Sequence, residues 1–271
     1  MPELPEVETT VRGIRPHLEG RRLLGATVRQ RQLRWPVTRG LAANITDRRV
    51  ESVTRRAKYI LIDAGDGHLI LHLGMSGSLR VLRSDLVAGP HDHVDLLLDD
   101  GRMLRLNDPR RFGALLYTRR DPLRHPLLAN LGPEPLEPGF DAAHLVALAR
   151  GRRTAVKSFI MDGSVVVGVG NIYASEALHR AGIHPRRAAG RISATRYAVL
   201  VETIREVLAA AIRAGGTTLR DFTREDGSPG YFRNELRVYD RDGEPCMTCG
   251  SAIRSEVIGQ RMSYWCPRCQ R

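Results

Sequence analysis

The four cysteines of this 271-residue chain lie close to its C-terminus as two Cys-x-x-Cys pairs. Cys246 and Cys249 are followed, after sixteen intervening residues, by Cys266 and Cys269. Two thiolate pairs at this separation fit one tetrahedral Zn²⁺ held between two knuckles, commonly in a β-hairpin finger. Four sulfur ligands leave no open position for water, so we expect one structural zinc and no hydrolysis at the metal. The alternative is a set of two redox-active pairs.

The N-terminal stretch MPELPEVETT places Pro2 and Glu3 directly after the initiator methionine. If Met1 is removed, the Pro2 nitrogen becomes a secondary amine, which is a nucleophile able to form a Schiff base with a carbonyl-like carbon. Glu3 is suited to donate and later accept a proton beside that nucleophile. The structural alternative is that Pro2 opens a helix, where its missing N–H costs nothing.

The charge balance of the chain is strongly basic, with 42 Lys and Arg against 30 Asp and Glu and a net charge of +12. Such an excess attracts polyanions and supplies the sequence-independent part of nucleic-acid affinity. No apolar run approaches the roughly 18 residues needed to span a bilayer. The first residues also lack the basic, apolar and cleavage regions of a secretory signal. Cysteine confined to two close pairs indicates a reducing compartment rather than a disulfide scaffold.

Lysine is almost absent from the chain, because Lys58 and Lys157 are its only two lysines and all the other cations counted above are arginine. A high-GC genome explains much of this preference. Lys58 stands in RRAKYI, just before an apolar strand. A solvated surface lysine is the ordinary interpretation. In this chain a retained lysine favours chemistry or a phosphate contact in which arginine would be too bulky or too firmly protonated.

Three glycine-containing segments carry further candidates. NDPRRFG (107–113) joins two predicted strands and places Phe112 beside Arg110, while HLGMSG (72–77) offers Met75. An apolar side chain next to an arginine can wedge into a base stack, although a lone Phe or Met more commonly lies in the core. In GVGNIYASEA (168–177), Asn171 stands where a helix would begin, which fits either an anion site or a tight turn.

The elements that must position these residues fall into a β-rich part and a helical part. Apolar residues at helical spacing predict a helix over 5–20, interrupted or kinked near Pro16. From Leu23 to Thr118, short strands alternate with turns such as Gly-Asp-Gly and Asp-Gly. This pattern predicts a sandwich or barrel with the first helix packed against it.

A linker and a run of helices follow the last predicted strand. Pro and Gly are concentrated at 131–139, which predicts the linker. Beyond it a period of 3.6 residues predicts four helices, the last of them with an N-cap at Ser193 and a stop at two glycines. Residues 217–235 are polar and contain glycine, so we expect a loop there.

The order and length of these motifs resemble those of the bacterial formamidopyrimidine-DNA glycosylase family, which removes 8-oxoguanine from DNA. Seven stretches spread over the whole chain carry the resemblance: MPELPEVET, RRAKYI, HLGMSG, NDPRRFG, VGNIYASEALHRAGIHP, DGSPGYF and CPRCQ. The resemblance implies an α+β multidomain fold. The domains would be an N-terminal β-sandwich catalytic domain with a flanking helix (1–132), a helix–two-turn–helix DNA-binding domain with a lesion-capping loop (133–235) and a C-terminal zinc-finger β-hairpin (236–271).

The resemblance also implies roles for particular residues. Pro2 would be the nucleophile and Glu3 the acid that assists loss of the base, while Lys58 and Arg261 would donate protons for β- and δ-elimination. Met75, Arg110 and Phe112 would fill the gap left by an extruded nucleotide, with Arg110 facing the orphaned cytosine. Asn171 would hold a phosphate together with Arg261. The DNA-contacting residues would be His72, Met75, His91, Arg110, Phe112, Arg152 and Asn171.

These expectations describe a base-excision repair enzyme, a DNA glycosylase and abasic-site lyase acting on oxidised purines. Its partner would be damaged double-stranded DNA, and its only cofactor would be one structural Zn²⁺. The protein would be a cytoplasmic, nucleoid-associated monomer that does not bind a membrane. Two alternatives remain open. A nucleic-acid-binding zinc protein without catalysis would share the charge, the wedge and the finger but would not need Pro2, Glu3 and Lys58 together. The endonuclease VIII group shares the chemistry and acts on oxidised pyrimidines.

Overall fold

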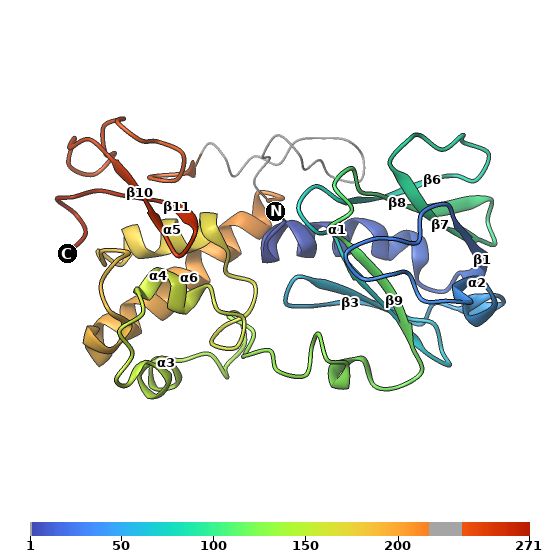
Figure 1. The fold of residues 1–271 in the computed structure, drawn as a ribbon, viewed down its shortest axis with the longest axis horizontal. Helices are drawn as coiled ribbons and strands as arrows, with labels where there is room; N and C mark the ends of the chain where they lie inside the picture. The colour runs from blue at the N-terminus through green and yellow to red at the C-terminus, as the bar shows by residue number, and fades with distance from the viewer. Residues whose placement is uncertain (1, 217–234) are drawn as a thin grey trace. The chain divides into compact units, whose positions relative to one another are not determined.

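The structure is a computed structural model that describes residues 2–216 and 235–271 and divides into two compact units. Unit 1 comprises Met1–Ala129 with Gly215–Tyr231, and unit 2 comprises Asn130–Ala214 with Phe232–Arg271. Figure 1 shows the strands of the first unit and the helices of the second. The predicted lesion-capping loop falls almost entirely on 217–234, which lie outside the described residues.

Unit 1 begins with one uninterrupted helix, α1 (Leu4–Leu18). The interruption predicted near Pro16 is wrong. Proline removes a single backbone hydrogen bond, and here only two helical residues follow it. The Glu19 N–H donates to the Arg15 carbonyl at 3.0 Å and closes the last turn. The apolar face of α1 is buried in the core, as its helical spacing predicts.

Two antiparallel sheets follow α1 and confirm the predicted strand pattern (Figure 1). The first sheet has the order β2 (Arg48–Arg49), β1 (Arg22–Val28), β7 (Asp92–Leu98), β8 (Arg102–Asn107) and β6 (Ser78–Arg83). The second has the order β3 (Ser52–Arg56), β4 (Tyr59–Asp63), β5 (His68–His72) and β9 (Ala114–Thr118). A short helix, α2 (Leu41–Ile45), contacts β1. Side chains from both sheets and from α1 form one apolar core, which is the arrangement of a β-sandwich.

Unit 2 contains the four helices predicted from the 3.6-residue period: α3 (Ala142–Ala149), α4 (Val156–Ile160), α5 (Asn171–Arg180) and α6 (Ala194–Arg213). The Ser193 hydroxyl accepts the Arg196 N–H at 3.3 Å, which confirms the predicted N-cap. Residues 131–139 contain neither helix nor strand. A two-stranded sheet, β10 (Arg254–Ile258) and β11 (Arg261–Trp265), separates the two cysteine pairs in the sequence.

The middle of unit 1 contains a buried ion-pair network. Arg105 on β8 donates from Nε to Asp95 Oδ1 at 2.8 Å and from Nη2 to Asp95 Oδ2 at 2.9 Å. Burial alone raises the pKa of Asp95, but hydrogen bonds from Arg105 and Arg29 hold that pKa below its ordinary value. The pair therefore stabilises the fold at neutral pH, and this stabilisation is lost as the pH falls through the folded-state pKa of Asp95.

We expect Arg105→Met to lower the free energy of unfolding by about 3 kcal/mol, because it leaves the buried Asp95 carboxylate without its bidentate partner. The matched control is Arg83→Ala, which removes an exposed ion pair with Asp85 and should cost less than about 1 kcal/mol. Urea unfolding at pH 7 measures both values. Equal losses in the two variants would contradict the assignment of Arg105 as a structural cation.

Candidate functional site

The first predicted site residues lie at the start of α1. Pro2 is buried, and Glu3, the N-cap residue of the helix, is 3% exposed. The Glu3 N–H donates to Glu6 Oε2 at 2.9 Å, so the Glu6 carboxylate reaches back over the helix start as in a capping box. This bond fixes the backbone at the helix start, so that Pro2 and the carboxylate of the adjacent Glu3 are held in the same turn of the chain.

Lys58 stands in the two-residue turn between β3 and β4, where Arg56 pairs with Tyr59. Three hydrogen bonds attach β3 to α1: Arg55 Nε to Glu8 Oε2 (2.9 Å), Arg15 Nε to the Val53 carbonyl (2.9 Å) and the Val53 N–H to Glu19 Oε1 (2.8 Å). Residue numbers fall along β3 as they rise along α1, so the two elements run in opposite directions. The turn that carries Lys58 therefore lies toward the end of α1 that carries Pro2 and Glu3.

The electrostatics of this contact favour a charged pair. Burial by itself raises the pKa of Glu8, but hydrogen bonds from Arg12 and Arg55 hold that pKa below its ordinary value. The Glu8 carboxylate is therefore ionised at neutral pH and anchors β3 through Arg55.

His72 and Met75 lie at the turn that follows β5. The Gly74 N–H donates to His72 Nδ1 at 2.9 Å, so in the neutral ring the proton is on Nε2. Burial, together with the charges of Lys58 and Arg34, lowers the pKa of His72 to about 4. His72 is therefore a neutral N–H donor at physiological pH, and Met75 beside it is half-buried.

The loop 107–113 is organised by Asp108, whose side chain is completely buried. Asp108 Oδ2 accepts the Gly113 N–H at 2.7 Å, its carbonyl bonds to His93 Nε2 at 2.8 Å, and its own N–H donates to the His91 carbonyl at 2.9 Å. Burial raises the pKa of the Asp108 carboxyl above its ordinary value, although the Gly113 N–H donates to that carboxyl and favours its charged form. The segments that carry His91 and Arg110 are thereby held together.

Phe112 is not part of the core, because 42% of its surface is exposed. The Arg110 guanidinium lies over its ring at 5.1 Å from the centroid, a cation–π contact. A Cβ atom at Gly74 would be 2.4 Å from the Phe112 carbonyl carbon, so the turn carrying Met75 packs directly on this loop. Unit 1 therefore presents Met75, Arg110 and Phe112 on two adjoining turns.

Asn171 and Arg261 lie in unit 2 and are connected through the β10–β11 hairpin. Asn171, the first residue of α5, donates from Nδ2 to the Met262 carbonyl at 3.0 Å. Lys157, fully buried on α4, donates to the same carbonyl at 3.2 Å and to Ser263 Oγ at 2.8 Å. Arg261 is exposed on the strand immediately before these acceptors, after a turn in which Gly259 and Gln260 both have positive φ, as a type I′ hairpin requires.

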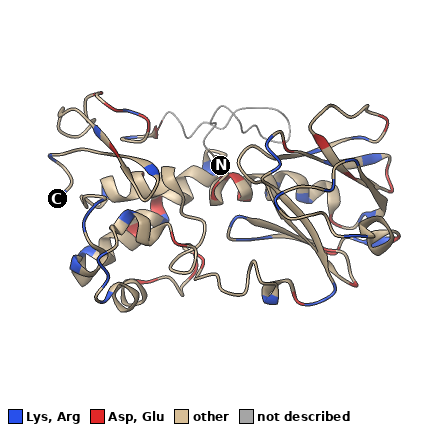
Figure 2. Ribbon diagram, in the orientation of Figure 1, with Lys and Arg blue, Asp and Glu red and all other residues tan. Residues whose placement is uncertain are grey.

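Arg152 lies in the connection between α3 and α4. Its Nε donates to the Leu148 carbonyl at 2.9 Å, and its guanidinium lies 5.7 Å from the centroid of the Phe159 ring. Arg152, Arg153 and Arg191 line a cavity of about 430 Å³ with Gly151, Ala188 and Gly190. Lys and Arg residues occur along the ribbons of both units (Figure 2). None of the described helices has the length and apolar character to cross a membrane.

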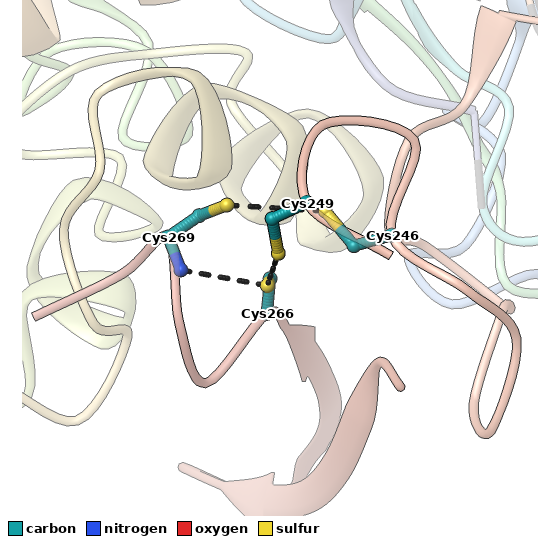
Figure 3. A group of neighbouring side chains, drawn as sticks. All are labelled: Cys246, Cys249, Cys266 and Cys269. Atoms are coloured by element: carbon teal, nitrogen blue, oxygen red, sulfur yellow. Dashed lines mark hydrogen bonds between the residues drawn. The ribbon is translucent and has the colours of Figure 1, made fainter. Parts of the chain in front are cut away.

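The four cysteines converge from the loop before β10 and the turn after β11 (Figure 3). Their sulfur atoms all lie within 4.8 Å of one another, with Cys246 to Cys269 at 3.9 Å and Cys249 to Cys266 at 3.4 Å. Zn–S bonds of about 2.3 Å in a tetrahedron place sulfur atoms roughly 3.8 Å apart, so the four thiolates fit one Zn²⁺. All four are free of disulfide bonds. The site is a closed, structural zinc centre, as the spacing predicts.

Some positioning residues were missed at the sequence level. Asp108 and Glu176 give no local signal, because one carboxylate in a loop or helix is ordinary. Glu176 is 1% exposed and accepts the consecutive backbone N–H groups of Arg237, Val238 and Tyr239, each at 2.9 Å. Lys157 stood out because the chain has only two lysines, but the residues around it in the sequence did not indicate a role.

Comparisons with known proteins cover nearly the whole chain. Family profiles match residues 1–115 (Formamidopyrimidine-DNA glycosylase N-terminal domain), 131–223 (Formamidopyrimidine-DNA glycosylase H2TH domain) and 243–271 (Zinc finger found in FPG and IleRS). The formamidopyrimidine-DNA glycosylase of Methylococcus capsulatus is 61% identical over all 271 residues, covering 100% of both chains. The protein of the same name from Alcanivorax borkumensis is 59% identical with the same coverage.

The chain belongs to the formamidopyrimidine-DNA glycosylase family. Solved members have the same fold. The MutM (Fpg) protein of Thermus thermophilus is 39% identical, with a TM-score of 0.90 over 99% of this chain and 98% of that one. Lactococcus lactis Fpg in complex with an abasic site containing DNA is 31% identical, with a TM-score of 0.92 over 99% of each chain. The family membership confirms the α+β fold with a zinc finger.

We expect removal of the zinc to unfold the finger and leave unit 1 folded, because the thiolate cluster is part of the finger's small core with Val238 and Ile253. A Trp35→Phe background leaves Trp265 as the only tryptophan. Its fluorescence should shift to the red on addition of a chelator, since Trp265 is 8% exposed in the folded finger. Amide exchange in 243–271 should lose protection while that of β4 and β5 is retained. A protected finger in protein shown to be metal-free would contradict this prediction.

Proposed function

We propose that this protein is a bifunctional DNA glycosylase and abasic-site lyase that removes oxidised purines, 8-oxoguanine and formamidopyrimidines, from double-stranded DNA. The observation that carries the proposal is the burial of Pro2 and Glu3 at the start of α1 in a chain that matches formamidopyrimidine-DNA glycosylases over its full length. Solved relatives are complexes with Fapy-dG containing DNA and with abasic DNA, which are a substrate and an intermediate of this reaction.

The proposed nucleophile is the Pro2 nitrogen after removal of Met1. An α-amino group titrates at about 7.7–8.0, so a useful fraction is neutral near pH 7, whereas a lysine amine at about 10.4 is almost wholly protonated. The Pro2 nitrogen attacks C1′ of the sugar and the C1′–base bond breaks, and the proton lost from the Pro2 amine passes to the departing base. Glu3 then supplies a proton to the ring oxygen O4′ as the sugar ring opens and leaves a Schiff base, an iminium ion, between Pro2 and C1′. The hydrogen bond between the Glu3 N–H and Glu6 supports this assignment by fixing the backbone between nucleophile and acid.

Extrusion of the damaged nucleotide costs a few kcal/mol of stacking, and the proposed wedge offsets part of it. Met75 and Phe112 would occupy the vacated space, and Arg110 would face the orphaned cytosine. The exposure of Phe112 and its contact with Arg110 support this role, since both side chains are outside the core.

Strand cleavage follows from the imine by successive loss of the 3′ and 5′ phosphates. We assign the proton transfers to Lys58 for β-elimination and Arg261 for δ-elimination. Asn171 would hold a phosphate together with Arg261. His91 and Arg152 would contact DNA as hydrogen-bond donors, and His72 would do so as a neutral donor through Nε2.

The same proposal includes the organisation of the protein and its location. The chain would act as a monomer with a sandwich domain at 1–132, a helix–two-turn–helix domain at 133–235 and a zinc finger at 236–271. The separate family matches support three such parts. We further propose that it acts in the cytoplasm on the nucleoid, where its DNA substrate would lie.

Borohydride reduction should trap a covalent adduct between the processed protein and duplex DNA that carries 8-oxoguanine opposite cytosine. Pro2→Gly should reduce trapping strongly, and Glu3→Gln should reduce base excision by about 100-fold or more. Glu51→Gln, at an exposed carboxylate of unit 1, is the control and should behave as wild type. DNA binding without any adduct would favour a non-catalytic binder. A preference for oxidised pyrimidines in a lesion panel would favour the endonuclease VIII type of activity.

Phe112→Ala should lower 8-oxoguanine excision about 10-fold by removing the wedge, while zinc content and thermal stability remain unchanged. Leu24→Ala is the matched control, because Leu24 is also a half-exposed apolar residue of unit 1. Single-turnover excision measures the effect. Unchanged excision would remove Phe112 from the recognition machinery.

A further inference from the structure

His179 on α5 contacts the zinc site without belonging to its ligand set. Its ring is 5% exposed, and its Nε2 atom lies 3.7 Å from the sulfur of Cys246, within hydrogen-bond distance for sulfur. The other ring nitrogen, Nδ1, is buried and has no hydrogen-bond partner in the part of the chain that the structure describes. His179 and all four cysteines belong to unit 2.

The surroundings of the ring decide where its proton lies. With the proton on Nδ1, a buried donor would have no acceptor, and the Nε2 lone pair would face the negatively charged sulfur. With the proton on Nε2, the N–H points at the thiolate, and only an acceptor lone pair is left unpaired. An unsatisfied buried donor and a repulsive contact both cost free energy, so the second tautomer is favoured.

A zinc ion with four thiolates has a net charge of −2, and burying it requires donors around the sulfur atoms. Backbone groups supply some of them, since the Thr248 N–H donates to Cys246 Sγ at 3.4 Å and the Cys269 N–H to Cys266 Sγ at 3.4 Å. His179 adds a side-chain donor from a helix that lies outside the finger.

We propose that His179 donates a hydrogen bond from Nε2 to the Cys246 thiolate, and that this bond retains zinc in the site and attaches the finger to α5. Hydrogen bonds to a ligand spread its charge and fix its orientation, and their loss typically weakens metal binding 10–100-fold. Two other residues of α5 already hold this region: Asn171 bonds to the Met262 carbonyl, and Glu176 bonds to the N–H groups of residues 237–239. The bond from His179 to Cys246 is a third attachment of the finger to this helix.

The test is the rate at which zinc transfers from the purified full-length protein to an excess of a chromogenic chelator, without DNA. His179→Phe keeps a ring of similar size without a donor and should release zinc about 10-fold faster. His179→Gln retains an N–H donor and should release zinc within about 3-fold of the wild-type rate. The matched control is His144→Phe, which removes a histidine of unit 2 that contacts the Val165 carbonyl away from the cysteines, and it should behave as wild type.

A second measurement on the wild-type protein removes any dependence on how the variants fold. In ¹⁵N-labelled protein loaded with Cd²⁺, the His179 ring should carry its proton on Nε2, with scalar coupling between that proton and ¹¹³Cd through the sulfur. A proton on Nδ1, or zinc release from folded His179→Phe at the wild-type rate, would overturn the proposal. Neither readout involves catalysis, so failure here is distinct from failure of the proposed glycosylase activity.

Discussion

A single buried carboxylate, that of Glu176, holds the start of the C-terminal segment on α5. Residues 237–239 lie in neither a helix nor a strand, and their three consecutive backbone N–H groups would be costly to bury without acceptors. Glu176 satisfies all three from a side chain that is 1% exposed. Charge-assisted hydrogen bonds of this kind are among the stronger ones in proteins. The finger is therefore attached to the helical part by directional hydrogen bonds, which suits a small element with few core residues.

Unit 1 uses the same device in its loop 107–113. The Asp108 side chain accepts the Gly113 N–H, and its backbone forms hydrogen bonds with the His91 carbonyl and the His93 ring. One buried residue therefore sets the path of a loop whose tip is exposed. Around α1 the bonds to β3 through Glu8, Arg15 and Glu19 set the position of the Lys58 turn. The exposed tip of the 107–113 loop thus stands on backbone that is fixed by a buried carboxylate, whereas the Lys58 turn follows a strand that is held partly by the exposed side chains of Arg15 and Glu19.

The sequence predicted the fold better than it predicted the polar residues that hold these loops in place. Hairpins at Gly-Asp-Gly and Asp-Gly, the helix capped by Ser193 and the thiolate cluster all follow from local rules with a short range, and the structure confirms them. The interruption at Pro16 is wrong because proline removes one backbone donor, and the helix continues through it with the Glu19 N–H bonded to the Arg15 carbonyl. Asp108, Glu176 and His179 were missed for a different reason. The partner of Asp108 is 5 residues away, those of Glu176 are 61–63 residues away, and that of His179 is 67 residues away. Only the tertiary fold brings Glu176 and His179 to their partners.

The presence of a lysine at position 157, in a chain with only two, has a physical explanation. Its ammonium group is fully buried and donates to two neutral oxygens, Ser263 Oγ and the Met262 carbonyl. A compact ammonium with tetrahedral donors fits two acceptors that converge on one point, whereas the planar guanidinium is larger and directs its donors in a fork. Arginine can serve in place of lysine on a solvated surface, but its larger, forked head group is less suited to this fully buried position. At Lys157, which donates to the β10–β11 hairpin, the compact shape of the amine therefore matters, and the proposed role of Lys58 as a proton donor would depend on its amine chemistry.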